Sequence, residues 1–294
     1  MSIQTRVGFV GLGNIGKPMA LRLAAHDAIE LQVFDVAEEP VKELIDAGAT
    51  AADSVAGMAN WADVICVMVR DDDQVRSVLG EVLADLKPRD SMVPVSFVVH
   101  STVAPETPTE LVEQVTKVCG FAVEIVDAPV SGGPMGAADG SLAILVGSSV
   151  GSFEAVEPVL AVMGSKVIHA GDVGAGTRFK LARNLLHFIS FTAATEAARL
   201  AEAAGLDLVA LGEVVRHTDA ITGGPGAILY RDTTAPIPDG DFWLNVFEHV
   251  RVLGEKDLAF AIELAEQLEV DVPLARLARD RLGPGLGLQG AHDD

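Results

Sequence analysis

The sequence predicts an α/β protein: a doubly wound parallel sheet in the first part of the chain, then a long helix, then a part that contains only helices. Apolar runs alternate with helical patterns up to about residue 148, and beyond about residue 171 no strand pattern occurs. Such alternation is typical of parallel strands that helices cover on both faces. We therefore expect two domains, residues 1–166 and 167–294.

The expected strands are short apolar runs that end in glycine or polar residues. They cover residues 6–13, 31–36, 63–69, 91–102, 122–129 and 142–148. Helical patterns follow them at residues 15–26, 40–49, 71–86 and 104–120. A long helix is expected over residues 176–205, and helices with Gly/Pro interruptions after it. The end of the chain, from Gly283, is expected to be a loose tail.

Composition and charge exclude several classes of protein. Hydrophobic residues make up 49% of the chain and the mean hydropathy is +0.35, which is enough for a sizeable core. The formal charge of -21 argues against nucleic acid and anionic membrane as partners. No apolar run is long enough to span a membrane, and no signal peptide is apparent. Cys66 and Cys119 are expected to be reduced thiols in a cytoplasmic protein, and no metal site is expected.

A glycine motif follows the first strand. "VGFVGLGNIGKPM" places Gly11, Gly13 and Gly16 in the pattern G-x-G-x-x-G between a strand and a helix. Gly11 would allow the tight turn, Gly13 the approach of a pyrophosphate, and Gly16 the close packing of helix and strand. The unpaired N–H groups at the helix N-terminus favour phosphate. This context predicts a Rossmann-type dinucleotide site.

An aspartate at the end of the second strand indicates which dinucleotide binds. Asp35 follows Gly16 by 19 positions and can accept hydrogen bonds from the adenosine ribose. It would repel a 2′-phosphate, and Glu38 and Glu39 would add to that repulsion. No lysine or arginine follows Asp35 before Lys42. The sequence therefore predicts NAD rather than NADP.

A second glycine-rich loop follows the strand that ends near residue 129. Ser131, Gly132 and Gly133 could hold a carboxylate through backbone N–H groups and the serine hydroxyl. Taken alone, "SGG" is more often a plain turn.

Four motifs in order resemble those of the β-hydroxyacid dehydrogenases, the family that contains 3-hydroxyisobutyrate dehydrogenase and tartronate semialdehyde reductase. They are "VGFVGLGNIGKPMA", "DAPVSGGPMGAADGSL", "GAGTRFKLARNLL" and "EKDLAFAIELAEQLEVDVPLA". The resemblance extends from residue 5 to about residue 280. It implies a Rossmann-type domain, an interdomain helix and a helical C-terminal domain that often mediates oligomerisation, so a homodimer or homotetramer is expected.

The resemblance also implies residue roles. Lys180 corresponds to the catalytic acid/base and Asn184 to the asparagine one turn later. The substrate is expected to contact Ser131, Gly132, Gly133 and His249. The cofactor is expected to contact Gly11, Gly13, Asn14, Ile15, Gly16, Asp35, Val69, Arg70, Gln74, Thr102 and Lys256.

Five positions depart from the family pattern around the expected site. Arg183 stands where asparagine is common, Val69-Arg70 where a Leu-Pro pair is common, and Gln74 where asparagine is common. His249 replaces a phenylalanine. These changes weaken any inference about the identity of the substrate, although they leave Lys180 and Asn184 in place.

The chemistry implied is oxidation of a small β-hydroxyacid, or reduction of the corresponding carbonyl, with 3-hydroxyisobutyrate as the first substrate considered. A neutral lysine can accept the hydroxyl proton, which requires a pKa lowered by partial burial. Arg183 and Arg231 are the candidates for a second anionic group on the substrate, which would favour tartronate semialdehyde or sulfolactaldehyde. An imine reductase and a non-catalytic cofactor-binding scaffold remain as alternatives. Both groups generally lack the lysine.

Overall fold

The computed structural model describes residues 4–87, 94–120 and 122–288. Within these residues nine strands form one sheet in the order β3-β2-β1-β4-β5-β6-β8-β7, and β9 pairs with β8. The strands are β1 (Thr5–Val10), β2 (Ile29–Phe34), β3 (Thr50–Ala51), β4 (Val64–Val67), β5 (Val95–Val99), β6 (Val123–Asp127), β7 (Val130–Ser131), β8 (Ala143–Gly147) and β9 (Lys166–Gly171).

The first six strands pair in parallel, as the alternation of strands and helices predicts. The parallel pairing ends at β8, which runs antiparallel to β6 and to β7. The connection before β8 contains only β7 and the seven-residue helix α6 (Gly133–Asp139). A helix of that length spans about 10 Å, too short to carry the chain back along a strand for a parallel return.

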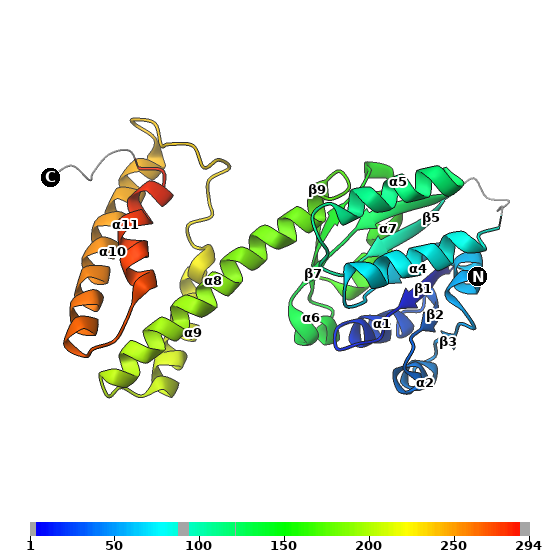
Figure 1. Cartoon of the computed structure of the whole chain (residues 1–294), viewed down its shortest axis with the longest axis horizontal. Coiled ribbons are helices and arrows are strands. Elements are labelled where there is room, and N and C mark those ends of the chain that lie inside the picture. Colours follow the sequence, from blue (N-terminus) through cyan, green and yellow to red (C-terminus); the bar gives the residue numbers. More distant parts are fainter. Residues whose placement is uncertain (1–3, 88–93, 121, 289–294) are drawn as a thin grey trace. The chain divides into compact units, whose positions relative to one another are not determined.

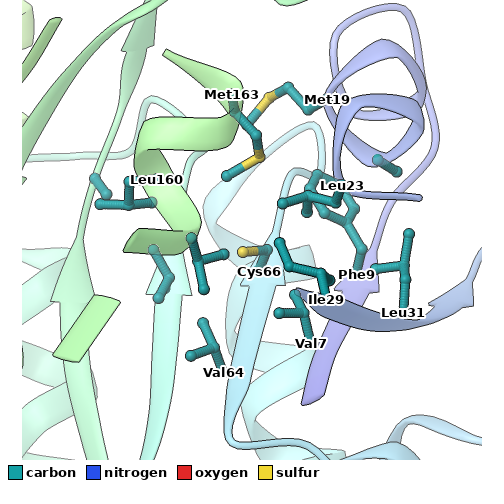
Figure 2. Packing of buried hydrophobic residues seen from close by; sticks show 14 of the residues in the cluster. Val7, Phe9, Met19, Leu23, Ile29, Leu31, Val64, Cys66, Leu160 and Met163 are labelled. Carbon is teal, nitrogen blue, oxygen red and sulfur yellow. The ribbon is translucent and has the colours of Figure 1, made fainter. Parts of the chain in front are cut away.

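Helices cover both faces of the sheet and give it two apolar cores. One core lies under α1 (Gly16–Ala24), α2 (Glu38–Asp46) and α7 (Val150–Met163). Figure 2 shows part of it, with Phe9 and Cys66 of the sheet beneath Leu23 and Leu160 of the helices. The other core lies under α3 (Val55–Trp61), α4 (Asp72–Ala84) and α5 (Thr107–Cys119). The doubly wound architecture predicted from the sequence is confirmed.

Helices α3 and α6 and strand β9 are among the elements that were not predicted from the sequence. Helices α3 and α6 have seven residues each, and strand β9 lies in a run whose side chains are exposed or half-buried, so none of them has a strong hydrophobic pattern. Since β9 continues to Gly171, the sheet extends past the predicted boundary at residue 166. Asp71 caps α4 by accepting a hydrogen bond from the Gln74 N–H at 3.0 Å.

After β9 the described chain is helical. It contains α8 (Ala175–Ala203), α9 (Leu208–Thr222), a 3₁₀ turn η1 (Gly224–Gly226), α10 (Phe242–Gln267) and α11 (Pro273–Gly285). The chain divides into two compact units, one ending at Arg183 and one beginning at Asn184, so the division falls within α8. In the second unit α10 and α11 lie side by side (Figure 1).

The second unit has only small apolar clusters among its described residues. One contains Ile237, Phe247 and Leu286, and the other contains Ile262, Ala265 and Val272. Buried Glu196 of α8 accepts hydrogen bonds from the N–H groups of Leu274 and Ala275 at 3.1 and 2.8 Å, so it satisfies the first turn of α11.

The expectation of a loose tail from Gly283 is wrong for the residues that the structure describes. Helix α11 continues to Gly285, and Leu286 is only 3% exposed because it packs against Phe247 and Ile237. The glycines and the proline in this segment concealed the apolar contacts, since composition alone indicates a flexible chain end. Residues 289–294 lie outside the described part.

Candidate active site

The predicted glycine motif forms the turn from β1 into α1. Gly11 has a φ of +93°, and a Cβ there would lie 2.3 Å from the Met68 carbonyl oxygen. A Cβ on Gly16 would lie 2.0 Å from the Gly11 carbonyl oxygen. Both positions therefore require glycine for the fold itself, because real Cβ atoms do not approach backbone oxygens so closely.

Gly13 differs from its two neighbours in the motif. A Cβ there would meet nothing within 4 Å, and the residue does not have a φ in the left-handed region. Nothing in the chain's own packing explains a glycine here. The open space in front of Gly13, at the start of α1, fits the close approach of a pyrophosphate to backbone N–H groups.

Asp35 is held directly beside this turn. Its Oδ2 accepts a hydrogen bond from the Leu12 N–H at 2.6 Å, and its Oδ1 accepts one from the Ala37 N–H at 2.8 Å. Each carboxylate oxygen can accept a further hydrogen bond. Asp35 therefore fixes the glycine turn and still has capacity for ribose hydroxyls.

A cavity of ≈ 620 Å³ opens in front of the turn, within the range typical of cofactor sites. Nine of the eleven predicted cofactor residues line it: Gly11, Gly13, Asn14, Ile15, Gly16, Asp35, Val69, Arg70 and Gln74. The sequence analysis did not assign the other residues that line it: Val10, Phe34, Val36, Val55, Met68, Ser77, Val78 and Glu81. Most of these are apolar positions with no motif around them, so no local signal marks them.

Hydrogen bonds hold Val69 and Arg70, two residues of the loop after β4 that line the cavity, in place. The Arg70 N–H donates to Gln74 Oε1 at 2.9 Å. Ser101, at the end of β5, accepts from the Val69 N–H at 3.0 Å and donates to the Val69 carbonyl oxygen at 2.8 Å. The role of Ser101 was not predicted, although it directly precedes Thr102 in the sequence. It holds the wall of the cavity in place rather than lining it.

Two predicted cofactor residues do not line this cavity. Thr102 is exposed in the loop after β5. Lys256 belongs to α10 of the second unit, where it forms an ion pair with Asp257 at 3.0 Å and lies 5.9 Å from the centre of the Phe260 ring. Their contacts with a cofactor remain predictions.

Lys180 lies near the start of α8 and is only 8% exposed. Its Nζ donates a hydrogen bond to the Val130 carbonyl oxygen at 2.6 Å. Among the described residues Lys180 has no ion-pair partner. Burial, and to a lesser extent repulsion by Arg183, lower the pKa of Lys180 to about 8. Such a lysine can both accept and donate a proton near neutral pH.

The hydrogen bond to Val130 brings Lys180 to the predicted substrate loop. Val130 and Ser131 form β7, and Gly132 and Gly133 continue the chain with φ values of +136° and +64°. Two consecutive positive φ angles explain why both positions are glycine. The structure therefore places the proposed acid/base next to the serine–glycine loop, although the two are 50 residues apart in the sequence.

A buried aspartate fixes the start of α8. Asp127, at the end of β6, accepts hydrogen bonds from the Gly174 N–H at 2.5 Å and the Thr177 N–H at 2.7 Å. Burial raises the pKa of Asp127, and these hydrogen bonds to its charged form oppose that rise. The role of Asp127 was not predicted, because a carboxylate at a strand end shows its partner only when the chain is folded.

The remaining predicted residues lie in the second unit. Asn184 follows Lys180 by four residues on α8, so the two side chains leave the helix on nearly the same side. His249 is an exposed residue of α10. Their contacts with a substrate remain predictions.

Two other titratable groups of the sheet are poorly suited to proton transfer. Burial lowers the pKa of His100 to about 4, so its ring is neutral at neutral pH; its Nδ1 lies 2.9 Å from the Ala128 carbonyl oxygen. Burial raises the pKa of the Cys66 thiol to about 12, which leaves it unreactive. Among the described residues, no group of three or more His, Cys, Asp or Glu side chains is arranged to hold a metal ion.

Comparison with known proteins agrees with this geometry. The domain described as the NAD binding domain of 6-phosphogluconate dehydrogenase matches residues 6–171. The domain described as the NAD-binding of NADP-dependent 3-hydroxyisobutyrate dehydrogenase matches residues 174–294. A 3-hydroxyisobutyrate dehydrogenase of Pseudomonas aeruginosa is 34% identical over 285 residues, covering 94% of this chain and 90% of that protein.

The chain belongs to the β-hydroxyacid dehydrogenase family.

Other members of this family are more similar but carry no stated substrate. An uncharacterized oxidoreductase of Mycobacterium tuberculosis is 50% identical over 284 residues, covering 96% of this chain and 94% of that protein. The crystal structure of a putative oxidoreductase from Mycobacterium avium has a TM-score of 0.90 and 48% identity, covering 97% of this chain and 99% of that one. The chain is thus an oxidoreductase with NAD(P)-binding domains. None of its described helices is long and apolar enough to cross a membrane.

Gly13→Ala separates cofactor binding from folding. We expect the thermal stability of the cofactor-free protein to change little, because the added methyl group meets only open space. We expect the affinity for NADH to fall at least tenfold, because the methyl group occupies the path of the pyrophosphate. Calorimetric titration with NADH measures the affinity. Gly151→Ala, which also adds a methyl group in open space, is the control. Unchanged NADH affinity in Gly13→Ala would exclude a pyrophosphate at this turn.

Proposed function

We propose that the chain is an NAD-dependent dehydrogenase of a short β-hydroxyacid, with Lys180 as the acid/base. The observation that carries this proposal is the position of Lys180. Its Nζ is buried, has no carboxylate partner in the described part of the chain, and lies 2.6 Å from the backbone of the residue that precedes Ser131. A buried lysine beside a potential carboxylate site is the arrangement that proton transfer to or from a bound hydroxyacid requires.

In this proposal each residue of the site has its own role. The nicotinamide, when bound, supplies the hydride chemistry. Ser131, Gly132 and Gly133 hold the substrate carboxylate through backbone N–H groups and the serine hydroxyl. The neutral Lys180 amine accepts the proton of the substrate hydroxyl during oxidation, and its ammonium returns a proton to the carbonyl oxygen during reduction. Asn184, one turn later, orients the lysine or the hydroxyl.

A short β-hydroxyacid fits this arrangement better than an α-hydroxyacid. The carboxylate and the hydroxyl must reach two different groups, the loop at Ser131 and the amine of Lys180. A β-hydroxyl gives one more carbon of reach. 3-Hydroxyisobutyrate is the first substrate to test, because a relative that is 34% identical carries that name. Sulfolactaldehyde and tartronate semialdehyde are the alternatives, favoured by the presence of Arg183.

The two alternative functions, an imine reductase and a non-catalytic scaffold, have less support. An imine reductase generally lacks the catalytic lysine, whereas Lys180 is present here and its pKa is near neutral. A non-catalytic scaffold would not need a buried cation at that position, since burying an unpaired ammonium destabilises a fold. Turnover of hydroxyacids against imines with the purified protein separates these functions.

Lys180→Ala tests the proposed mechanism. We expect kcat to fall roughly 10²–10⁴-fold, the usual contribution of a positioned acid or base, while NADH affinity stays near that of the wild type. Lys180→Arg should also be inactive, because a guanidinium stays protonated. Lys166→Ala, which removes an exposed lysine of the same unit, is the control. Near-normal kcat in Lys180→Ala would show that the lysine is structural.

The pH profile checks the same residue in the wild type. Because burial lowers the pKa of Lys180 to about 8, kcat/KM for oxidation should rise with pH and level off above about 8. For reduction it should fall as the pH rises through the same value. The opposite signs follow from the amine acting as a base in one direction and the ammonium acting as an acid in the other.

We also propose that NAD is preferred over NADP. The matching C-terminal domain is described by reference to an NADP-dependent enzyme, but the residues expected to meet a 2′-phosphate belong to the first unit. Asp35 and Glu81 both line the cavity there, and Val36, next to Asp35, is 96% exposed. Arg70, a cation that also lines this cavity, forms an ion pair with Asp71 at 3.7 Å, so we expect the two carboxylates to repel a phosphate dianion.

Substitutions at Asp35 and Val36 should shift the cofactor preference from NAD toward NADP. Asp35→Ser combined with Val36→Arg removes a carboxylate and supplies a cation. We expect the ratio of kcat/KM for NADP to that for NAD to rise at least tenfold, since charge-assisted hydrogen bonds to phosphate are among the stronger ones. Steady-state kinetics with both cofactors measures the ratio. A wild-type enzyme that already works better with NADP would contradict the assignment.

We further propose that the protein is a homodimer or homotetramer. Helix α9 has no buried residue, and large apolar side chains are exposed on α8 and α9, among them Phe188, Phe191, Val209 and Ile221. Apolar surface of this kind marks an interface between proteins. Sedimentation at micromolar concentration should give a mass at least twice that of the 30.7 kDa chain. A sharp monomer peak would refute the proposal.

A further inference from the structure

A short segment that begins at the end of β6, residues 127–131, connects the parts of the proposed active site. Its first residue, Asp127, fixes the start of α8 through two backbone hydrogen bonds. Near its end, the Val130 carbonyl oxygen accepts the hydrogen bond from Lys180, and Ser131 begins the serine–glycine loop. The conformation of this segment therefore determines how the proposed acid/base lies relative to the expected carboxylate site.

Ala128, in the middle of this segment, is fully buried. Its N–H group donates a hydrogen bond to the Val99 carbonyl oxygen at 2.8 Å, which continues the pairing with β5. Pro129 follows it and restricts Ala128 to an extended backbone. The carbonyl group of a buried residue needs a donor, because an unpaired buried carbonyl destabilises the fold. The donor here comes from a side chain, that of His100.

His100 follows directly after β5 and is only 1% exposed. Its Nδ1 lies 2.9 Å from the Ala128 carbonyl oxygen, and because a carbonyl oxygen can only accept, Nδ1 must carry the proton. Burial lowers the pKa of His100 to about 4, so the ring is neutral at the pH at which Lys180 would work. The ring also stacks on Phe9 of β1, with a centroid distance of 6.3 Å.

A histidine at this buried position costs stability that packing alone does not explain. In the described part of the chain, the Nε2 atom of His100 has no hydrogen-bond partner. Burying a polar atom without a partner is unfavourable, and an apolar side chain would fill the same space without that cost. What the histidine supplies in return is the N–H donor for the Ala128 carbonyl oxygen.

We infer that His100 is a positioning residue of the proposed active site: its Nδ1–H holds Ala128, and through it residues 127–131, so that Val130 and Ser131 stay in place beside Lys180. The inference rests on the proposed function and adds to it a residue that no motif marks. A displacement of about 1 Å at a reacting group can lower a rate about 100-fold, even when its cause lies away from the chemistry. A histidine that only filled the core would leave the chemistry of the folded enzyme unchanged.

Two substitutions of nearly equal size test the inference. His100→Leu removes the donor, whereas His100→Asn keeps an N–H group close to the position of Nδ1. We expect kcat to fall about 10- to 100-fold in His100→Leu and to stay near the wild-type value in His100→Asn, with NADH affinity unchanged in both. His169→Leu is the control, because it removes a 2.9 Å histidine contact with a carbonyl oxygen outside the segment, that of Ser148. Equal kcat values in His100→Leu and His100→Asn would overturn the inference.

A measurement on the wild type keeps the inference testable if either variant fails to fold. Nuclear magnetic resonance of protein that contains isotope-labelled histidine reports which ring nitrogen carries the proton. The signal of His100 is recognised because its ring stays neutral until the pH falls to about 4, its pKa. We expect the proton on Nδ1. A proton on Nε2 would contradict the inference, because Nδ1 could then not donate to Ala128.

The titration of Lys180 separates this inference from the proposed function, because it needs no substrate. Lysine labelled at Cε reports the pKa of Lys180 by nuclear magnetic resonance, and Lys180→Arg identifies its signal. We expect the pKa to rise from about 8 toward the ordinary value in His100→Leu but not in His100→Asn, since burial is the main cause of its lowering and a displaced segment admits water. Arg183, the smaller cause, is the same in both variants.

The two outcomes are distinguishable. If hydroxyacids are turned over but the pKa of Lys180 is the same in His100→Leu and His100→Asn, the inference fails and the proposed function stands. If the pKa differs between the two variants but no hydroxyacid reacts, His100 still positions Lys180 and the proposed function fails instead.

Discussion

The position of the proposed acid/base depends on one buried carboxylate. Asp127 ends β6 and accepts two backbone hydrogen bonds from the first turn of α8, so it fixes that helix against the end of the sheet. The chain packs so closely around this contact that two neighbouring glycines, Gly147 and Gly176, have no room for a side chain. A Cβ on Gly147 would lie 2.3 Å from Asp127 Oδ1, and one on Gly176 would lie 2.1 Å from the Leu145 carbonyl oxygen. This position of α8 allows Lys180, one turn further along, to donate a hydrogen bond to the Val130 carbonyl oxygen.

This placement links function to stability. The fold lowers the pKa of Lys180 from 10.5 to about 8, a shift that corresponds to a cost on the order of 3 kcal/mol for keeping the charged form buried. Because the folded state binds this proton more weakly than the unfolded chain does, the cost is fully present below about pH 8. It disappears as the pH rises from about 8 to the ordinary value of lysine.

The two units differ in how they are stabilised. The sheet unit has two apolar cores beneath its helices, and that rigidity holds the glycine turn, Asp35 and the loop braced by Ser101 in fixed positions. The helical unit has small clusters and much exposed apolar surface among its described residues. In the proposed oligomer, another copy of the chain would cover part of this apolar surface.

The sequence alone determined the features that depend on local pattern. The alternation of strands and helices gave the architecture of the sheet unit, and the glycine spacing with Asp35 located the cofactor turn, because backbone conformation and close approach restrict those positions to particular residue types. Only the tertiary structure decided features that depend on residues far apart in the chain. These include the reversal of β8, the role of Asp127 and Ser101, the burial of Lys180 beside Val130, and the packing of Leu286. Each of these requires a partner at least 12 residues away, and for all but β8 the partner is more than 30 residues away, so no local pattern in the sequence carries that information.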